Sequence, residues 1–347
     1  MPTWGEIVDE VNQAENRLPD GRPDFDKVRR RYLAALAQKT GRATIVYSTA
    51  FLDKEGASNV GIALGDIQGF MNGVAGLQQR ELDLLVTSPG GSPEAAESIV
   101  AYLRTRFDNI RAIVPVAAMS AATMLVLGSD EIVMGAHSQL GPIDPQFAVS
   151  TPDGPRTAPG QAILDQFEQA KQECKDPQNL PAWIPILRAY LPGLLAMCHD
   201  QREVAERMVR QWLERYMLRG DPKGAEKADA AAKWFANYDY FGSHGRRVSL
   251  QDVRGLGLHA LALEDDDDLQ DAVLSVHHCY SVTHSNTPAV KIIENHLGRA
   301  YVKIEREIVI RPAAPQPGAP PGTGQPLPPG VTPANRAARR RAQRGRR

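Results

Sequence analysis

The sequence is poor in cysteine and has no long apolar run. Its three cysteines lie far apart in 347 residues and form no Cys-x-x-Cys pair, which argues against a disulfide framework and against a zinc knuckle. No stretch reaches the ~18 uninterrupted apolar residues of a membrane span, and residues 1–6 lack the basic and apolar pattern of a secretory signal. We therefore expect a cytoplasmic protein, with peripheral membrane contact through Trp183–Leu187 or the C-terminal tail as the alternative.

Motifs for cofactors and metals are also missing. There is no phosphate loop of the Walker type, and Gly255–Gly257 lacks the third glycine and the preceding strand of a dinucleotide site. No pair of histidines stands with a carboxylate at a spacing typical of a metal centre. We expect neither a cofactor nor a metal ion.

Charge is balanced over the whole chain but not along it. The formal net charge is −1, yet residues 336–347 carry seven arginines and no acid. Residues 312–333 hold nine prolines and four glycines, a composition that cannot bury enough surface to offset its ordering entropy. We predict a disordered tail over 312–347. Its arginines are suited to an acidic partner, although a solvated tail without a partner fits equally well.

The rest of the chain predicts an α/β fold. Hydrophobic residues make up 42% of the sequence, which is enough for a sizeable core. We expect a helical segment at 1–42, a β-α core at 43–160, and a mainly helical region at 161–311 that completes the fold and makes oligomer contacts. Alternating patterns within the core predict a largely parallel sheet, with strands near 44–47, 82–87, 110–116 and 131–134 and helices near 64–80, 92–107 and 120–127.

Two of the predicted strand-to-helix turns could carry chemistry. They are Ser88-Pro89-Gly90-Gly91 and the segment Ala117–Met124, which contains Ser120. Hydrolysis of an amide by a nucleophile needs an activated oxygen and N–H groups directed at the developing oxyanion. A serine in the first turn of a helix lies beside backbone donors that have no partner. The plain alternative is that Ser120 caps a helix and Gly90–Gly91 forms an ordinary turn.

Several motifs resemble one known family. The segments Ser88–Gly91, Ala118–Thr123 and Leu140–Gln146 are similar to the serine dehydrogenase proteinase family, a branch of the Clp protease/crotonase superfamily related to signal peptide peptidase A. The resemblance continues through Trp4–Ile7, Ser243–Arg246, Val276–His278 and Ile292–His296, so it covers about residues 1–305. It implies a β-α superhelix of the Clp protease/crotonase type with a helical C-terminal half, usually assembled into homo-oligomers.

The resemblance also implies site residues. Ser120 matches the nucleophile, and the N–H groups of Ala121 and of Gly90 or Gly91 match the oxyanion-hole donors. Many relatives have glycines where this chain has Ala121 and Ala122. Alanine keeps the N–H group but narrows the approach of a substrate.

The general base is not part of these motifs. In the Clp protease subunit a histidine follows the serine by about 25 residues, and this chain has none there. A Ser-Lys dyad as in signal peptide peptidases fits better, because a desolvated lysine has a lowered pKa. Lys171 borders the apolar side of a helix predicted at 162–174 and is the first choice, with Lys175 and His244 as alternatives. The plain alternative is that both lysines lie on the surface.

The sequence therefore predicts an ATP-independent serine peptidase that acts on peptides or unfolded proteins. Two other functions remain open on the same fold. One is acyl-CoA chemistry of the crotonase type, which would leave Ser120 idle. The other is an oligomeric scaffold whose catalytic centre is vestigial.

Overall fold

The computed structural model describes residues 2–151 and 154–305. These described residues belong to one compact unit. The tail predicted to be disordered, residues 312–347, lies outside the described residues.

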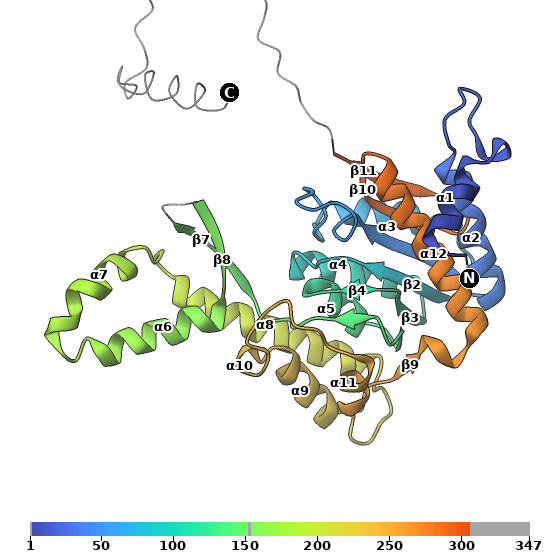
Figure 1. The fold of residues 1–347 in the computed structure, drawn as a ribbon. Coiled ribbons are helices and arrows are strands. Elements are labelled where there is room, and N and C mark those ends of the chain that lie inside the picture. Colours follow the sequence, from blue (N-terminus) through green and yellow to red (C-terminus); the bar gives the residue numbers. More distant parts are fainter. Residues whose placement is uncertain (1, 152–153, 306–347) are drawn as a thin grey trace, which may run out of the picture. The chain divides into compact units, whose positions relative to one another are not determined.

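A seven-stranded sheet forms the centre of the described unit (Figure 1). Its strand order is β11-β10-β1-β2-β3-β5-β9. Strands β1, β2, β3, β5 and β9 run parallel, whereas β10 pairs antiparallel with β1 and β11 antiparallel with β10. The strands are β1 (Ala43–Thr49), β2 (Glu81–Thr87), β3 (Asn109–Val114), β5 (Glu131–Met134), β9 (Ala260–Ala262), β10 (Ala289–Asn295) and β11 (Ala300–Ile304). The predicted largely parallel sheet is confirmed.

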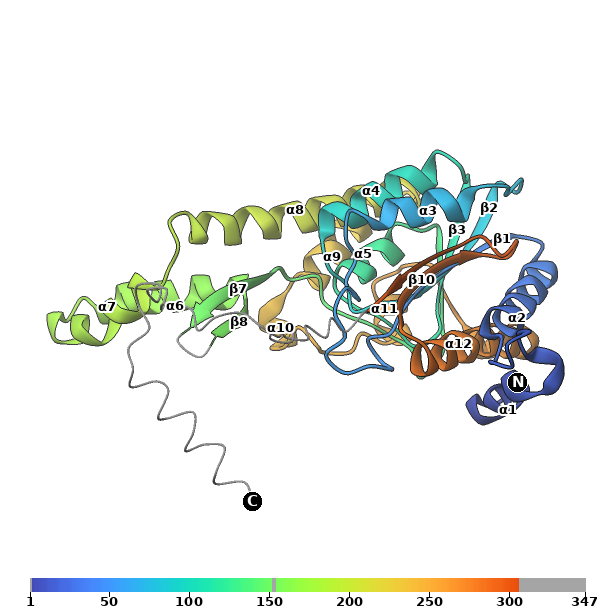
Figure 2. The same cartoon turned by 90° about the horizontal axis from the view of Figure 1, so that it is seen from above.

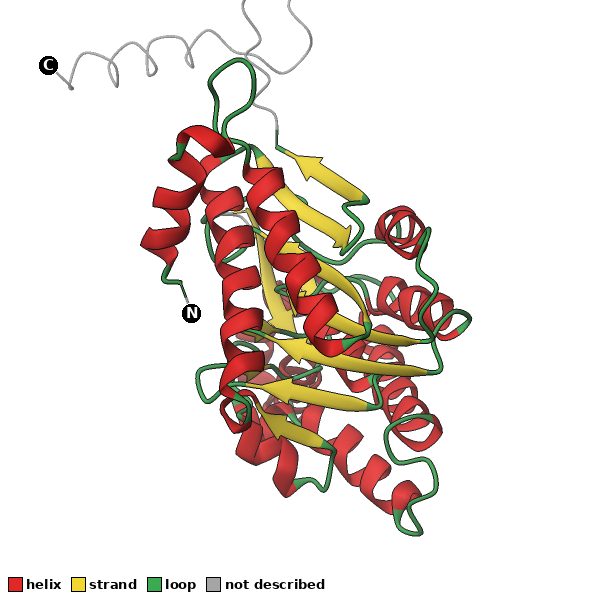
Figure 3. Cartoon of the chain, turned by 90° about the vertical axis from the view of Figure 1, so that its right-hand side faces the viewer, coloured by secondary structure: helices red, strands yellow, loops and turns green. Residues whose placement is uncertain are grey.

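Helices cover both faces of this sheet (Figure 3). On one face lie α3 (Asp66–Val74), α4 (Pro93–Arg104) and α5 (Ala121–Leu127); on the other lie α2 (Phe25–Thr40) and α12 (Asp267–Asn286), with α1 (Trp4–Asn12) packed against them. Because side chains alternate along a strand, neighbouring residues of β1 enter different cores. Tyr47 stacks on Phe70 of α3 at a ring-centroid distance of 5.7 Å, whereas Val46 packs in the core that contains Leu36 of α2.

Each of the two turns of interest is followed by a helix in the structure. Helix α4 begins after Ser92, whose side chain accepts a hydrogen bond from the N–H of Ala95 at 3.0 Å, with Pro93 in the first turn. This arrangement is typical of a helix N-terminus. The short two-stranded pairing of β4 (Ala117–Ala118) with β6 (Gln139–Leu140) leads into α5.

The remaining elements follow the core in the chain. They are the hairpin β7 (Gln146–Thr151)–β8 (Gly154–Pro159) and the helices α6 (Gly160–Glu173), α7 (Leu180–Arg188), α8 (Leu194–Arg215), α9 (Gly224–Phe235), α10 (Tyr238–Phe241) and α11 (Leu250–Gly255), with 3-10 turns at Ala14–Asn16, Pro177–Asn179 and Leu263–Asp265. Helix α8 runs from beside α5 out to α6 (Figure 2). Ile163 of α6 and Cys198 of α8 share a small apolar cluster there.

The described part of the region 161–311 contains strands as well as helices. It supplies β9, β10 and β11 in addition to helices. Strand β10 was not recognised because Lys291 and Glu294 interrupt its apolar pattern. Both side chains are fully buried and are neutralised by ion pairs inside the protein.

None of the helices within the described residues has the length and apolar character needed to cross a membrane. In the segment Trp183–Leu187 the indole of Trp183 is buried and donates a hydrogen bond to Glu173 at 2.8 Å. Ile184 and Ile186 of the same segment are exposed. Peripheral membrane contact through this segment stays a prediction.

Candidate active site

The two candidate turns lie side by side. Ser88 follows β2, and its N–H donates a hydrogen bond to the carbonyl of Ala117 at 3.1 Å. The N–H of Met119 donates in return to the carbonyl of Ser88 at 3.0 Å. These bonds form a parallel bridge between Ser88 and Ala118. As a result, the Gly90–Gly91 turn and Ser120 both follow this parallel bridge in the chain and lie at the same end of it.

Ser120 has an unusual backbone conformation, with φ +52° and ψ −123°. A non-glycine residue at positive φ costs about 1–3 kcal/mol and persists only where its surroundings impose it. Ser120 occupies the N-cap position of α5, yet its side chain forms no capping hydrogen bond. The simple capping role therefore does not explain this serine.

Gly90 lies directly against Ser120. It has φ +99°, and a Cβ atom at this position would lie 2.7 Å from Cβ of Ser120 and 2.6 Å from the carbonyl oxygen of Met119. Both the conformation and the close approach require glycine. The N–H of Gly90 donates to Oγ of Ser88 at 3.2 Å, so this donor is already engaged.

The two other predicted oxyanion donors are not engaged in this way. Gly91 is exposed, has φ +145°, and among the described residues no acceptor for its N–H is found. Ala121 is the first residue of α5, and the first N–H groups of a helix have no acceptor within it. Gly91 and Ala121, which follow the contacting residues Gly90 and Ser120 in the chain, thus offer two N–H groups.

Thr123 connects the third predicted motif to this site. Its hydroxyl donates to the carbonyl of Ala118 at 2.7 Å and accepts a hydrogen bond from the N–H of Gly141 at 2.9 Å. The neighbouring Leu140 pairs in parallel with Ala118. Because β4 and β6 run parallel, the segment Leu140–Gln146 continues beyond the same end of this pair at which Ser120 follows β4.

A carboxylate of that segment holds one of the predicted bases. Nδ1 of His244 lies 2.7 Å from Oδ1 of Asp144, and Oδ2 of Asp144 accepts a second hydrogen bond from Gln146 at 2.6 Å. The Asp144 side chain is 3% exposed and the imidazole is 26% exposed. An isolated antiparallel bridge between Leu140 and Val248 brings the two segments together.

That bridge brings the segments of Asp144 and His244 close to each other. Asp144 lies four residues after Leu140, and His244 lies four residues before Val248. Sequence reasoning named His244 as an alternative base but missed Asp144 as its partner, although Asp144 stands within a motif that carried the family resemblance.

The two candidate lysines have different surroundings from those expected. Lys171 lies on α6, its side chain is 55% exposed, and Nζ pairs with both carboxylate oxygens of Glu168 at 2.8 Å. Lys175 is also exposed and donates to the side chain of Gln172 at 2.5 Å. Neither lysine has the desolvated surroundings on which the sequence argument for a lowered pKa depended.

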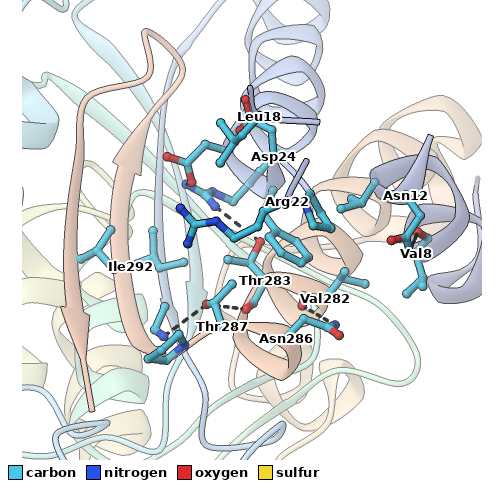
Figure 4. Close-up of a pocket in the computed structure, with 18 of the residues that line it drawn as sticks. Val8, Asn12, Leu18, Arg22, Asp24, Val282, Thr283, Asn286, Thr287 and Ile292 are labelled. Carbon is cyan, nitrogen blue, oxygen red and sulfur yellow. Dashed lines mark hydrogen bonds and ion pairs between the residues drawn. The ribbon is translucent and has the colours of Figure 1, made fainter. Parts of the chain in front are cut away.

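A cavity of about 740 Å³ lies elsewhere in the unit, between α1, α2, α12 and the β10–β11 hairpin (Figure 4). Val282, Thr283 and Asn286 of α12 line one side of it, and Ile292 lines the other. None of its lining residues belongs to Ser88–Gly91 or to Ala117–Met124. It is separate from the candidate active site.

Residues 74–180 match the model of a family described as ClpP-like SDH-type serine proteinase. The matched segment contains both turns and Asp144, whereas His244 lies beyond it. Over this segment the predicted resemblance to that family is confirmed, and the fold of the described residues is mixed α/β.

Two curated relatives come from the archaeon Methanocaldococcus jannaschii. The uncharacterized protein MJ0137 is 28% identical over 181 residues, which are 52% of this chain and 54% of that protein. The uncharacterized protein MJ1495 is 30% identical over 95 residues, or 27% of this chain and 30% of that protein. The chain thus spans about half the length of the first relative and less of the second.

Two solved structures are also similar. A serine-to-alanine mutant of the 1510-N membrane-bound stomatin-specific protease is 13% identical, with a TM-score of 0.38, and covers 66% of this chain and 82% of its own. A lysine-to-alanine mutant of that protease, in complex with a substrate peptide, is 16% identical with a TM-score of 0.32 and covers 55% of this chain and 63% of its own.

Proposed function

We propose that the protein is an ATP-independent serine peptidase with Ser120 as its nucleophile. The observation that carries the proposal is the backbone of Ser120, which is held at φ +52° against Gly90 while its hydroxyl caps no helix N–H. Strain of this kind is characteristic of functional sites. The match of residues 74–180 to a serine proteinase family supports the same activity.

In the proposed reaction, Oγ of Ser120 attacks the carbonyl carbon of a peptide bond and loses its proton to a base. The N–H groups of Gly91 and Ala121 donate to the resulting oxyanion. The protonated base then passes the proton to the leaving amine, and the C–N bond breaks. Water activated by the same base hydrolyses the acyl-enzyme and frees Ser120.

For the base we favour His244 over Lys171. His244 is fixed through Nδ1 by the buried carboxylate of Asp144, which leaves Nε2 to accept a proton. Lys171 is exposed, and its Nζ is paired with the carboxylate of Glu168. Lys171 remains the general base predicted from the sequence, and substitution of each residue decides between Lys171 and His244.

Substitution of Ser120 tests the activity itself. We expect the purified chain to cleave unfolded protein substrates such as casein, and Ser120→Ala to abolish the cleavage. Ser98→Ala, on the exposed side of α4, is the matched control and should cleave like the wild type. Mass spectrometry after fluorophosphonate treatment should locate the adduct on Ser120. Equal cleavage by Ser120→Ala and wild type would overturn the assignment.

The remaining parts of the proposal concern the assembly and the alternatives. A homo-oligomer is expected, and its size is measured by light scattering on the full chain. A wild-type protein that neither cleaves peptides nor forms an adduct would instead fit the vestigial scaffold. Saturable binding of coenzyme A would fit acyl-CoA chemistry.

A further inference from the structure

A buried carboxylate close to the Gly90–Gly91 turn pairs with two lysines. Asp66, the first residue of α3, is fully buried and accepts hydrogen bonds from Lys291 at 2.6 Å and Lys303 at 2.8 Å. The hydroxyl of Tyr47 also donates to it, at 2.8 Å. Burial acts to raise the pKa of Asp66, but the two ammonium groups outweigh it and hold the pKa below its ordinary value. The group is therefore an ionised carboxylate with two cations around it.

Lys291 makes one contact that Lys303 does not. Its Nζ also donates to the carbonyl oxygen of Gly61 at 2.6 Å. Lys291 is fully buried, whereas the Lys303 side chain is 24% exposed and no bond to Gly61 is found for it among the described residues. Lys291 thus connects the Asp66 carboxylate to the backbone of the neighbouring loop.

That backbone leads directly to the candidate oxyanion hole. The peptide that carries the Gly61 carbonyl also carries the N–H of Ile62, which donates to the carbonyl of Gly90 at 2.6 Å. The peptide that carries the Gly90 carbonyl in turn carries the N–H of Gly91. Because C=O and N–H point in opposite directions in a trans peptide, the bond from Ile62 directs the N–H of Gly91 away from Ile62.

The close fit of this loop leaves little room for another orientation. The N–H of Ser92 donates to the carbonyl of Ile62 at 2.9 Å. Gly91 therefore lies between two residues, Gly90 and Ser92, that are both hydrogen-bonded to Ile62. A Cβ atom on Gly91 would lie 2.4 Å from both the nitrogen and the carbonyl oxygen of Ile62. The Gly90–Gly91 peptide is therefore oriented by the segment that Lys291 binds.

We propose that Lys291, anchored by Asp66, is a positioning residue that orients and polarises the Gly91 N–H as an oxyanion donor. The path runs from the ammonium through the Gly61–Ile62 peptide to the Gly90–Gly91 peptide. Hydrogen bonds in such a chain polarise one another, and a positive charge at its start strengthens the last donor. This inference rests on the proposed peptidase activity, in which the Gly91 N–H receives the developing charge.

If Lys291 only neutralised Asp66, its loss and the loss of Lys303 should have similar effects. Lys303 therefore provides the control. Lys291→Met removes the bond to Gly61 together with one cation beside Asp66, whereas Lys303→Met removes only a cation beside Asp66. We expect Lys291→Met to lower kcat about tenfold or more with KM changed less than about twofold. The loss should stay below the about 10²–10³ that deletion of an oxyanion donor costs. Lys303→Met should keep kcat within about twofold of the wild type.

Amide hydrogen exchange gives a readout that does not need activity. In the folded full-length protein, the amides of Ile62 and Ser92 should exchange faster in Lys291→Met and at the wild-type rate in Lys303→Met. If Lys291→Met does not fold, Lys291→Gln, which keeps a donor without the charge, is compared in the same way.

The outcomes separate the two proposals. A wild-type chain without activity dependent on Ser120 would refute the peptidase, while the exchange rates still test the anchoring of the loop. Equal exchange in both variants, or an equal loss of kcat in both, would overturn the role of Lys291.

Discussion

Nδ1 of His244 lies 2.7 Å from Oδ1 of Asp144, although 100 residues separate them in the chain. Two short backbone pairings bring them together: Ala118 with Leu140, and Leu140 with Val248. The same pairings direct Asp144 toward the end of β6 at which Ser120 follows β4. A carboxylate on Nδ1 fixes the tautomer and stabilises the imidazolium that forms during catalysis.

The first prediction concerns the identity of the base. We expect His244→Ala to lower kcat about 10²–10⁴-fold, because proton transfer by a positioned side chain contributes about this much. Lys171→Ala should stay within about twofold of the wild type, since that side chain is exposed and paired with Glu168. Steady-state kinetics on one peptide substrate compares them. Full activity in His244→Ala with none in Lys171→Ala would return the assignment to the Ser-Lys dyad.

A second prediction concerns Asp144. If Asp144 acts only by holding His244, Asp144→Asn lowers kcat while its combination with His244→Ala lowers kcat no further than His244→Ala alone. Groups that work as a unit show such non-additive effects. Kinetics of the two single variants and the double variant measure this. Additive losses would mean that Asp144 acts independently of the imidazole.

A third prediction uses the strain at Ser120. Glycine tolerates the φ of +52° found there, whereas alanine retains the strain. Ser120→Gly should therefore be more stable than Ser120→Ala by about 1 kcal/mol, after allowing for the greater chain entropy of glycine in the unfolded state. Both variants lack the hydroxyl group, so urea denaturation compares the backbone effect alone. A higher midpoint for Ser120→Ala than for Ser120→Gly would show that the strain is smaller than this entropy difference.

A fourth prediction concerns Gly90. Gly90→Ala introduces a methyl group 2.6 Å from the Met119 carbonyl oxygen and 2.7 Å from Cβ of Ser120, at φ +99°. Gly220 has φ +85° and no atom within 4 Å of such a methyl group, so Gly220→Ala is the matched control. The control should lose about 1 kcal/mol of stability from strain alone. Gly90→Ala should lose clearly more stability and most of its activity, as measured by denaturation and peptide cleavage.

The sequence was most informative where one short segment determines the outcome. Apolar β-branched runs predicted β1, β2, β3 and β5, because buried parallel strands require them. The Gly90–Gly91 turn and the helix start at Ser120 also follow from local spacing. The positive φ of Ser120 does not, because it depends on the contact with Gly90 from another strand.

Features that depend on residues far apart in the chain were harder to predict from the sequence. Strand β10 contains the buried charges Lys291 and Glu294, whose partners stand on other elements of the fold, so its pattern did not resemble a core strand. The resemblance to signal peptide peptidases and the apolar side of the predicted helix favoured Lys171 as the base, yet the exposure of that side chain is set by how α6 packs. The partner of His244 could be found only from the fold, in which two short pairings bring distant segments together.

The last prediction concerns the pH dependence of stability through His284. This side chain is fully buried, and burial lowers the pKa of its imidazole to about 4. Its nitrogens lie 3.1 Å from Oγ of Ser48 and 3.1 Å from the carbonyl oxygen of Ala289. The unfolded chain, with an ordinary histidine pKa near 6.5, binds a proton more readily than the folded protein does.

His284 should therefore contribute stability that is fully present above about pH 6.5 and is lost as the pH falls toward about 4. The loss from this one group amounts to about 3 kcal/mol at most. Replacement of His284 by Gln removes the titrating group but keeps polar atoms that can bind Ser48 and Ala289. The free energy of unfolding, measured in urea between pH 4 and pH 8, should then fall less steeply in His284→Gln than in the wild type. Parallel curves for the two proteins would show that His284 does not titrate in this range.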